Sequence, residues 1–324
     1  MPPSPTPRPV AELLNTPIPT KLWHYTSLKG FHGIVTSKRI FATDLRFLND
    51  IEEFVHTRKV AHEIISEAPE LDADGFAYRK LLKQAEFLAF EGRAVKGTEI
   101  FVACFTAAED QLSQWRGYSH GSSGVSLAFD LRNHRPPAGS GSLVSFAPCV
   151  YEAAQKEKLL LDALHHFQEE VSGYRKEIFK RACDLDPTKR TEKKDTAVDE
   201  FLNAHPDQKR EFDRFVEATS KTSADCLRIA ALLKNSSFKE EDEWRLVLPV
   251  FMDSEKPTME FRYGKTSLIP YIAHAFLENS PLPIVDVILG PGSDENSVFA
   301  AKRLLKSKGL DVEPRLSRVP YRSS

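Results

Sequence analysis

Residues 99–105, EIFVACF, form a nearly unbroken apolar run that has the length of a β-strand. Such a run is typical of a strand that is buried on both faces of a sheet. Strand-like patterns also occur at 124–130, GVSLAFD, and at 243–250, EWRLVLPV. We therefore expect a sheet in which at least one central strand lies between two layers.

Further strand patterns occur on either side of these three. They lie at 20–26, 40–42, 143–152, 258–263, 284–289 and 311–317. Between about 153 and 234 the apolar residues instead recur at helical spacing, as at Leu159, Leu160, Leu164 and Phe167. Strands on both sides of a helical segment predict one mixed sheet, to which residues 20–50, 98–151 and 240–317 contribute. The expected fold class is α+β, with a single domain over 20–322 and a helical insertion at about 153–234.

The N-terminal residues 1–19 are rich in proline, which favours a disordered tail that holds no helix. Thr26 or Ser27 can cap a helix that runs from Leu28 to about Ser37. Other helices are predicted at 51–65, 76–93 and 296–308.

Composition excludes several classes of protein. The 324 residues include 44 Lys and Arg against 46 Asp and Glu, for a net charge of -2, which argues against a general nucleic-acid or membrane binder. No apolar run approaches the roughly 20 residues of a membrane span, and the N-terminus lacks an apolar signal segment. The four cysteines are Cys104, Cys149, Cys183 and Cys226, and they form no CxxC pair. We expect a soluble cytoplasmic protein with reduced thiols, no zinc site and no disulfide framework.

Several common enzyme signatures are absent. The sequence has no GxGxxG after a strand, no HExxH and no complete phosphate-binding loop. Residues 121–124, GSSG, also lack the spacing of a serine-hydrolase nucleophile. Chemistry has to be sought in less regular motifs.

The first such motif is residues 23–26, WHYT, on the first predicted strand. A histidine beside aromatic rings can donate a hydrogen bond to a sugar hydroxyl while a neighbouring ring packs on a base. The alternative is a core histidine whose ring nitrogens are satisfied by the backbone.

The second motif is residues 113–118, SQWRGY, predicted as a loop between two strands. A loop this rich in aromatic residues and arginine suits a base or nicotinamide ring together with a phosphate. The alternative is a hydrophobic plug in which Trp115 and Tyr118 fill the core and Arg116 forms an ion pair.

The third motif is residues 240–245, EEDEWR, which lead into the strand at 243–250. Strand alternation places Glu241, Glu243 and Arg245 on one face. Charges that converge in this way are costly to bury and do not help folding, which favours a functional site. The alternative is a solvent-exposed strand edge that carries charge.

The order of these motifs, with FATD at 41–44, GVSLAFD at 124–130, LGPG at 289–292 and PYR at 320–322, resembles a large bacterial family labelled as a domain of unknown function. The resemblance spans about residues 21–322. Members of that family often lie near mobile-element and phage-defence genes, which would make a toxin or antiviral role the expectation here.

The opening motif is also similar to that of ADP-ribosyltransferases, and the resemblance implies their fold, with NAD as a substrate and no metal. It implies that Glu243 is catalytic and that Glu241 positions the acceptor. The residues implied to bind NAD are His24, Tyr25, Thr26, Ser113, Trp115, Arg116 and Tyr118. The ring that clamps nicotinamide could be that of Trp115 or that of Tyr118.

The implied chemistry needs one Glu that stays charged, one His and stacking aromatic rings, because the cationic nicotinamide ring of NAD leaves as a neutral molecule through an oxocarbenium-like transition state. Replacing Glu243 by Gln should then remove the charge and spare folding. The expected function is ADP-ribose transfer to a protein or nucleic acid. One alternative is a non-catalytic nucleotide-sensing or interaction module, and another is a nuclease that holds a metal on Glu241, Asp242 and Glu243.

Overall fold

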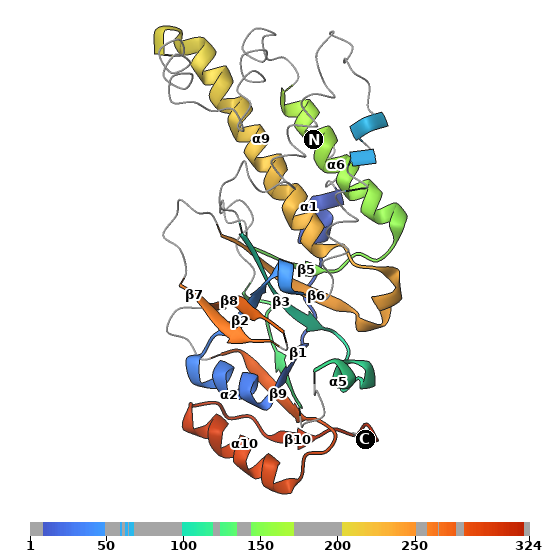
Figure 1. The fold of residues 1–324 in the computed structure, drawn as a ribbon, viewed down its shortest axis with the longest axis vertical. Helices are drawn as coiled ribbons and strands as arrows, with labels where there is room; N and C mark the ends of the chain where they lie inside the picture. The colour runs from blue at the N-terminus through green and yellow to red at the C-terminus, as the bar shows by residue number, and fades with distance from the viewer. Residues whose placement is uncertain are drawn as a thin grey trace, which may run out of the picture.

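The computed structural model joins strands from both ends of the chain in one ten-stranded sheet (Figure 1). The structure describes residues 9–48, 59, 62–63, 65–67, 99–118, 124–134, 144–171, 203–250, 258–264, 266–276 and 282–320. The helix predicted at 76–93 and most of the helix predicted at 51–65 lie outside these residues, as does Cys183. The expected α+β class is confirmed, and the sheet is mixed but mostly antiparallel.

The strand order is β10-β9-β4-β1-β3-β2-β8-β7, with β6 paired to β3 and β5 paired to β6. The strands are β1 (Leu22–Ser27), β2 (Ile40–Asp44), β3 (Glu99–Thr106), β4 (Gly124–Phe129), β5 (Ser145–Pro148), β6 (Glu243–Val250), β7 (Met259–Tyr263), β8 (Leu268–His274), β9 (Ile284–Leu289) and β10 (Pro314–Leu316). The apolar run that suggested a central strand is β3, which contacts β6 along its whole length.

Two layers of helices cover the sheet. Helices α2 (Leu28–Ser37) and α10 (Glu295–Ser307) contribute Phe31, Ile34 and Leu305 to a core that includes Phe101 and Phe105 of β3. Ser27 caps α2, since its Oγ accepts from the Gly30 amide at 3.1 Å, as predicted.

The opposite face packs against α1 (Pro9–Leu14), α6 (Ala153–Val171) and α9 (Pro206–Leu232). Helices α6 and α9 contact each other and extend together away from the sheet (Figure 1). They are the described helices of the segment for which a helical insertion is expected.

Three elements differ from the prediction. Residues 9–14 are helical because Pro9 occupies the first position, where no amide partner is needed, and Val10 and Leu13 are buried. Strand β8 was not predicted, and it contains Pro270, a residue that usually argues against a strand. Pro270 lies just beyond the residues of β8 that pair with β2, so it interrupts no bond there. The third difference is α5 (Leu112–Tyr118), which replaces the predicted loop.

Candidate functional site

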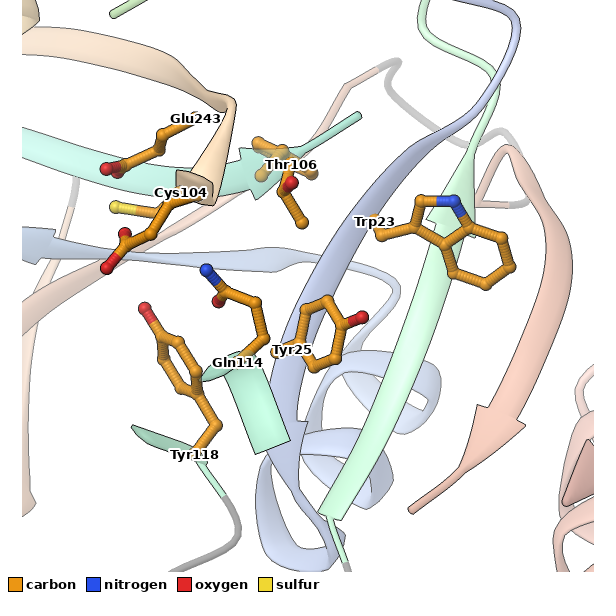
Figure 2. Close-up of a pocket in the computed structure, with 9 residues that line it drawn as sticks. Trp23, Tyr25, Cys104, Thr106, Gln114, Tyr118 and Glu243 are labelled. Atoms are coloured by element: carbon orange, nitrogen blue, oxygen red, sulfur yellow. The ribbon is translucent and has the colours of Figure 1, made fainter. Parts of the chain in front are cut away.

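An open pocket of about 230 Å³ lies where β1, β3, α5 and the start of β6 meet (Figure 2). Its walls combine aromatic rings with an amide, a thiol, a hydroxyl and two carboxylates. The lining residues are Trp23, Tyr25, Cys104, Phe105, Thr106, Gln114, Tyr118, Glu241 and Glu243. Aromatic walls with a few convergent polar groups are typical of a small-molecule site.

The divergence of β1 from β3 helps to make room for this pocket. The two strands pair only at Trp23 and Thr106, and β3 meets β2 only at Val102 and Phe101. In the gap, His24 Nδ1 donates to the Cys104 carbonyl at 2.8 Å, because a carbonyl can only accept. Burial lowers the pKa of His24 to about 4, so its imidazole is neutral at pH 7.

Helix α5 divides its side chains between the core and the pocket. Gln114 and Tyr118 are four residues apart and so share the helix face that lines the pocket. Trp115 turns into the core, where its Nε1 donates to Asp110 Oδ1 at 2.8 Å. Its ring packs so closely on Gly290 that a Cβ there would lie 3.0 Å from it. Trp115 therefore fixes the helix against the sheet.

Two tyrosines form the aromatic side of the pocket. Tyr25 is buried, with its hydroxyl accepting from the Gln111 amide at 2.9 Å, and burial raises its pKa to about 12. The Tyr118 residue is 42% exposed, yet its hydroxyl end lies toward the pocket among groups that exclude water, and this burial raises its pKa as well (Figure 2). Their ring centroids are 6.4 Å apart. Both phenols are protonated at neutral pH.

The carboxylate side of the pocket is a buried ion network. Glu243 is 5% exposed, and its carboxylate accepts from Arg245 Nε at 2.8 Å and from Lys234 Nζ. Arg245 also donates to the Ala231 carbonyl at 2.8 Å, at the C-terminal end of α9. Burial by itself would raise the pKa of Glu243, but the charges of Arg245 and Lys234 outweigh it and lower that pKa to about 2. Glu243 is therefore ionised throughout the physiological range.

Glu241 reaches the same network from a different element. It ends the 3-10 helix η4 (Ser236–Glu241), and Asp242 follows it with a φ of 42°. Lys234 Nζ donates to its carboxylate at 2.7 Å, and the Glu241 side chain is 27% exposed. Of the two carboxylates, that of Glu241 is therefore the more accessible to a ligand.

A family model described as Protein of unknown function (DUF2971) matches residues 114–246. No curated protein and no solved structure matches the chain.

The DUF2971 match includes Gln114, Tyr118, Glu241 and Glu243 but begins after the first strand and so leaves out its WHYT motif. It supports the expected kinship with a domain of unknown function. The similarity to ADP-ribosyltransferases stays a prediction.

The pocket contains four of the nine residues that the sequence suggested for a site, namely Tyr25, Tyr118, Glu241 and Glu243. His24 sits behind the pocket wall, and its ring packs on Phe105 at 5.6 Å between centroids. Thr26 lies beneath the first turn of α2, against Gly30.

The second motif contributes less to the pocket than expected. Trp115 is a core residue, which agrees with the plug interpretation, and Arg116 is exposed outside the pocket lining. Ser113 is partly buried, and its Oγ has no hydrogen-bond partner in the described part of the chain. The correction follows from α5 being a helix, because a helix turns neighbouring residues to different sides.

The prediction made from the third motif was partly correct. Glu243 and Arg245 do share one face of β6, opposite Trp244, but Glu241 precedes the strand, so alternation does not place it. The alternative of an exposed charged edge is wrong, since β6 lies between β3 and β5. Burial between two cations also reverses the expectation that Glu243→Gln spares folding.

Sequence reasoning missed Trp23, Cys104, Phe105, Thr106 and Gln114 in the lining, and Lys234 behind it. The helical spacing of Gln114 and Tyr118 and the alternation of Cys104 and Thr106 were usable signals. No local signal identified Lys234, because nothing in the neighbouring sequence distinguishes a lysine that follows a helix.

In the described part of the chain, no group of three or more His, Cys, Asp and Glu residues could hold a metal ion. Glu241, Asp242 and Glu243 therefore do not assemble the ligand set that the nuclease interpretation requires. The described helices also include none with the length and apolar character needed to span a membrane.

Proposed function

We propose that the pocket binds the nicotinamide-ribose end of NAD and that the protein is an ADP-ribosyltransferase-like enzyme. The observation that carries this proposal is that two carboxylates and two tyrosine rings line one pocket. Glu241 and Glu243 line the pocket together with Tyr25 and Tyr118, and Figure 2 shows the Tyr118 hydroxyl directed toward the Glu243 end of the pocket.

This arrangement suits a substrate that is both aromatic and cationic. The tyrosine rings offer flat surfaces for a nicotinamide ring. When the bond from its nitrogen to ribose C1′ breaks, the electron pair neutralises the ring and positive charge develops on the sugar. A carboxylate beside the sugar stabilises that charge until an acceptor oxygen or nitrogen bonds C1′ and loses its proton.

The two carboxylates differ in what they can contribute. The low pKa of Glu243 keeps its charge at neutral pH, while its two cationic partners hold it in place. Glu241 is more accessible and can contact a ribose hydroxyl or the acceptor. Because the pocket is open on one side, one end of a dinucleotide would occupy it and the remainder would extend outward.

A non-catalytic nucleotide-sensing module is the second candidate. The observation that favours it is the pairing of Glu243 with both Arg245 and Lys234, which offsets the charge that catalysis would use. A module of this kind would bind NAD in the same pocket and leave it intact.

Nicotinamide release and acceptor labelling separate the two candidates. Glu243→Gln should lower nicotinamide release by about two to three decades, the size of losing one electrostatic stabiliser. Glu241→Gln should reduce labelling of an acceptor more than it reduces NAD hydrolysis. Glu240→Gln is the matched control, since Glu240 lies next to Glu241 on η4 and is exposed outside the pocket.

Thermal unfolding of each variant shows whether a loss of turnover reflects a loss of fold. If the parent binds NAD but does not turn it over, the proposed enzymatic activity is wrong and the sensing module is supported. Neither binding nor turnover by the folded parent would overturn both candidates.

A further inference from the structure

Arg262 is a cation on β7 that lies beside a hydroxyl group and an aromatic ring. Its Nη2 donates to Thr43 Oγ1 of β2 at 2.7 Å. Its guanidinium carbon lies 5.9 Å from the centroid of the Tyr271 ring on β8. The residue as a whole is exposed, but these neighbours partly desolvate the guanidinium, and the loss of water lowers its pKa.

No carboxylate pairs with this guanidinium in the described part of the chain. Several other arginines do have acidic partners: Arg46 pairs with Asp44, Arg132 with Asp130, Arg228 with Asp225, Arg245 with Glu243 and Arg315 with Glu109. Glu260, on the same face of β7 as Arg262, instead accepts from the Tyr271 hydroxyl at 2.7 Å. A partly desolvated guanidinium beside a hydroxyl and without a carboxylate can readily bind an anion.

This cation lies on the pocket side of the sheet. Thr43 pairs directly with Val102, so the two side chains share a face, and alternation along β3 places Cys104 of the pocket on that face too. Two residues along a strand span about 7 Å. The positive charge of Arg262 is close enough to disfavour protonation of His24 and to interact with Tyr118.

We infer that Arg262 and Thr43 form an anion subsite for a phosphate group of a nucleotide whose sugar or ring occupies the adjacent pocket. A guanidinium can donate two parallel hydrogen bonds to a phosphate, and the Thr43 hydroxyl can orient the guanidinium for this contact. The inference rests on the nucleotide binding of the proposed function, but it needs no catalysis.

The test measures binding of ADP, pyrophosphate and adenosine to the full chain by titration calorimetry at low salt. ADP should bind more tightly than either pyrophosphate or adenosine. Arg262→Gln should weaken ADP binding about ten- to hundredfold, the usual effect of losing hydrogen bonds to a charged group. The ADP affinity of Arg262→Lys should lie between those of the parent and Arg262→Gln, because lysine keeps the charge but cannot donate two parallel hydrogen bonds.

Arg303→Gln is the matched control. Arg303 also places its guanidinium over an aromatic ring, at 5.4 Å from the Phe299 centroid, but it lies on α10, which packs with α2 on the opposite side of the sheet. The Arg303→Gln variant should bind ADP as tightly as the parent does. Unliganded melting temperatures identify any variant that fails to fold, and Arg262→Lys then supplies the comparison.

Equal ADP affinity of the parent and a folded Arg262→Gln variant would overturn the subsite. Absence of ADP binding to the parent would overturn it as well. Pyrophosphate binding as tightly as ADP would overturn the nucleotide as the source of the phosphate. These outcomes are independent of NAD turnover, so an ADP-binding protein that leaves NAD intact would keep this inference and lose only the catalytic part of the proposed function.

Discussion

The two faces of β6 differ sharply although they alternate along a single strand. One face carries Trp244, Leu246 and Leu248, which join the apolar core beneath α2 and α10. The other carries Glu243 and Arg245, both nearly excluded from solvent beside the end of α9. Apolar burial stabilises the fold directly, whereas buried charges must recover a large desolvation cost through their partners.

The pocket lies on the face of β6 that carries Glu243 and Arg245. Glu243 contributes to both the ion network and the pocket lining, while Trp244 packs on Phe146 with ring centroids 5.7 Å apart. An apolar strand of the same shape would have been sufficient for folding. The cost of the charged face is consistent with retention of a functional carboxylate, and the following measurements examine that difference.

The largest effect is expected on the apolar face. Trp244→Ala should destabilise the protein by about 3–5 kcal/mol, because it removes a large buried ring and leaves a cavity. Urea unfolding at pH 7 and at pH 3 measures the change, which should be similar at both values. Phe238→Ala is a control on an exposed ring and should cost far less. A cost below about 1 kcal/mol would show that the apolar face is not the principal support of β6.

Glu243→Gln should cost about 3 kcal/mol at pH 7, near the lower end for breaking a buried ion pair, because the amide oxygen still accepts one hydrogen bond. The folded-state pKa of about 2 lies below the ordinary 4.5, so the contribution of this carboxylate is present above pH 4.5 and is lost as the pH falls toward 2. The difference in unfolding free energy between parent and variant should therefore shrink over that window.

Urea unfolding across pH 2 to 7 provides the measurement for Glu243, with Glu240→Gln as a control that stays close to the parent throughout. A Glu243→Gln variant as stable as the parent at pH 7 would contradict the account of a buried, charge-balanced network.

The smallest of the three effects involves His24 of β1, which packs on Phe105 and donates to the Cys104 carbonyl of β3, the strand next to β6. Its folded-state pKa of about 4 lies below the ordinary 6.5, so the unfolded chain binds the proton more readily. The parent should lose on the order of 2 kcal/mol of stability as the pH falls from 6.5 to 4.

His24→Gln should flatten that part of the stability profile, whereas His32→Gln, at an exposed position on α2, should leave it unchanged. Thermal unfolding of the parent and both variants at half-unit steps of pH measures these stability profiles. Identical slopes for the parent and His24→Gln would mean that the imidazole is not held neutral.

Much of the fold could be predicted because strands leave a local signal. The alternation in 243–250 and the apolar run in 99–105 identified β6 and β3. The sequence failed where a local rule conflicted with its surroundings. Strand β8 contains Pro270, which usually argues against a strand, and the segment 113–118 was predicted as a loop although it forms a helix.

The candidate site was less predictable. Glu243 and Arg245 could be paired because alternation fixes their common face. Trp115 and Tyr118 could not be assigned to core and pocket, because the choice depends on how α5 rests on Gly124 and Gly290.

The sequence by itself determined the α+β class, the central strands and the polar face of β6, because backbone geometry alone makes side chains alternate along a strand. Only the tertiary structure decided which groups meet. Lys234 reaches Glu243 from the end of α9, His24 bonds the carbonyl of Cys104, 80 residues away in sequence, and Arg262 reaches Thr43 across 219 residues. Such contacts depend on how whole strands and helices pack, and that packing is not encoded in the spacing of neighbouring residues.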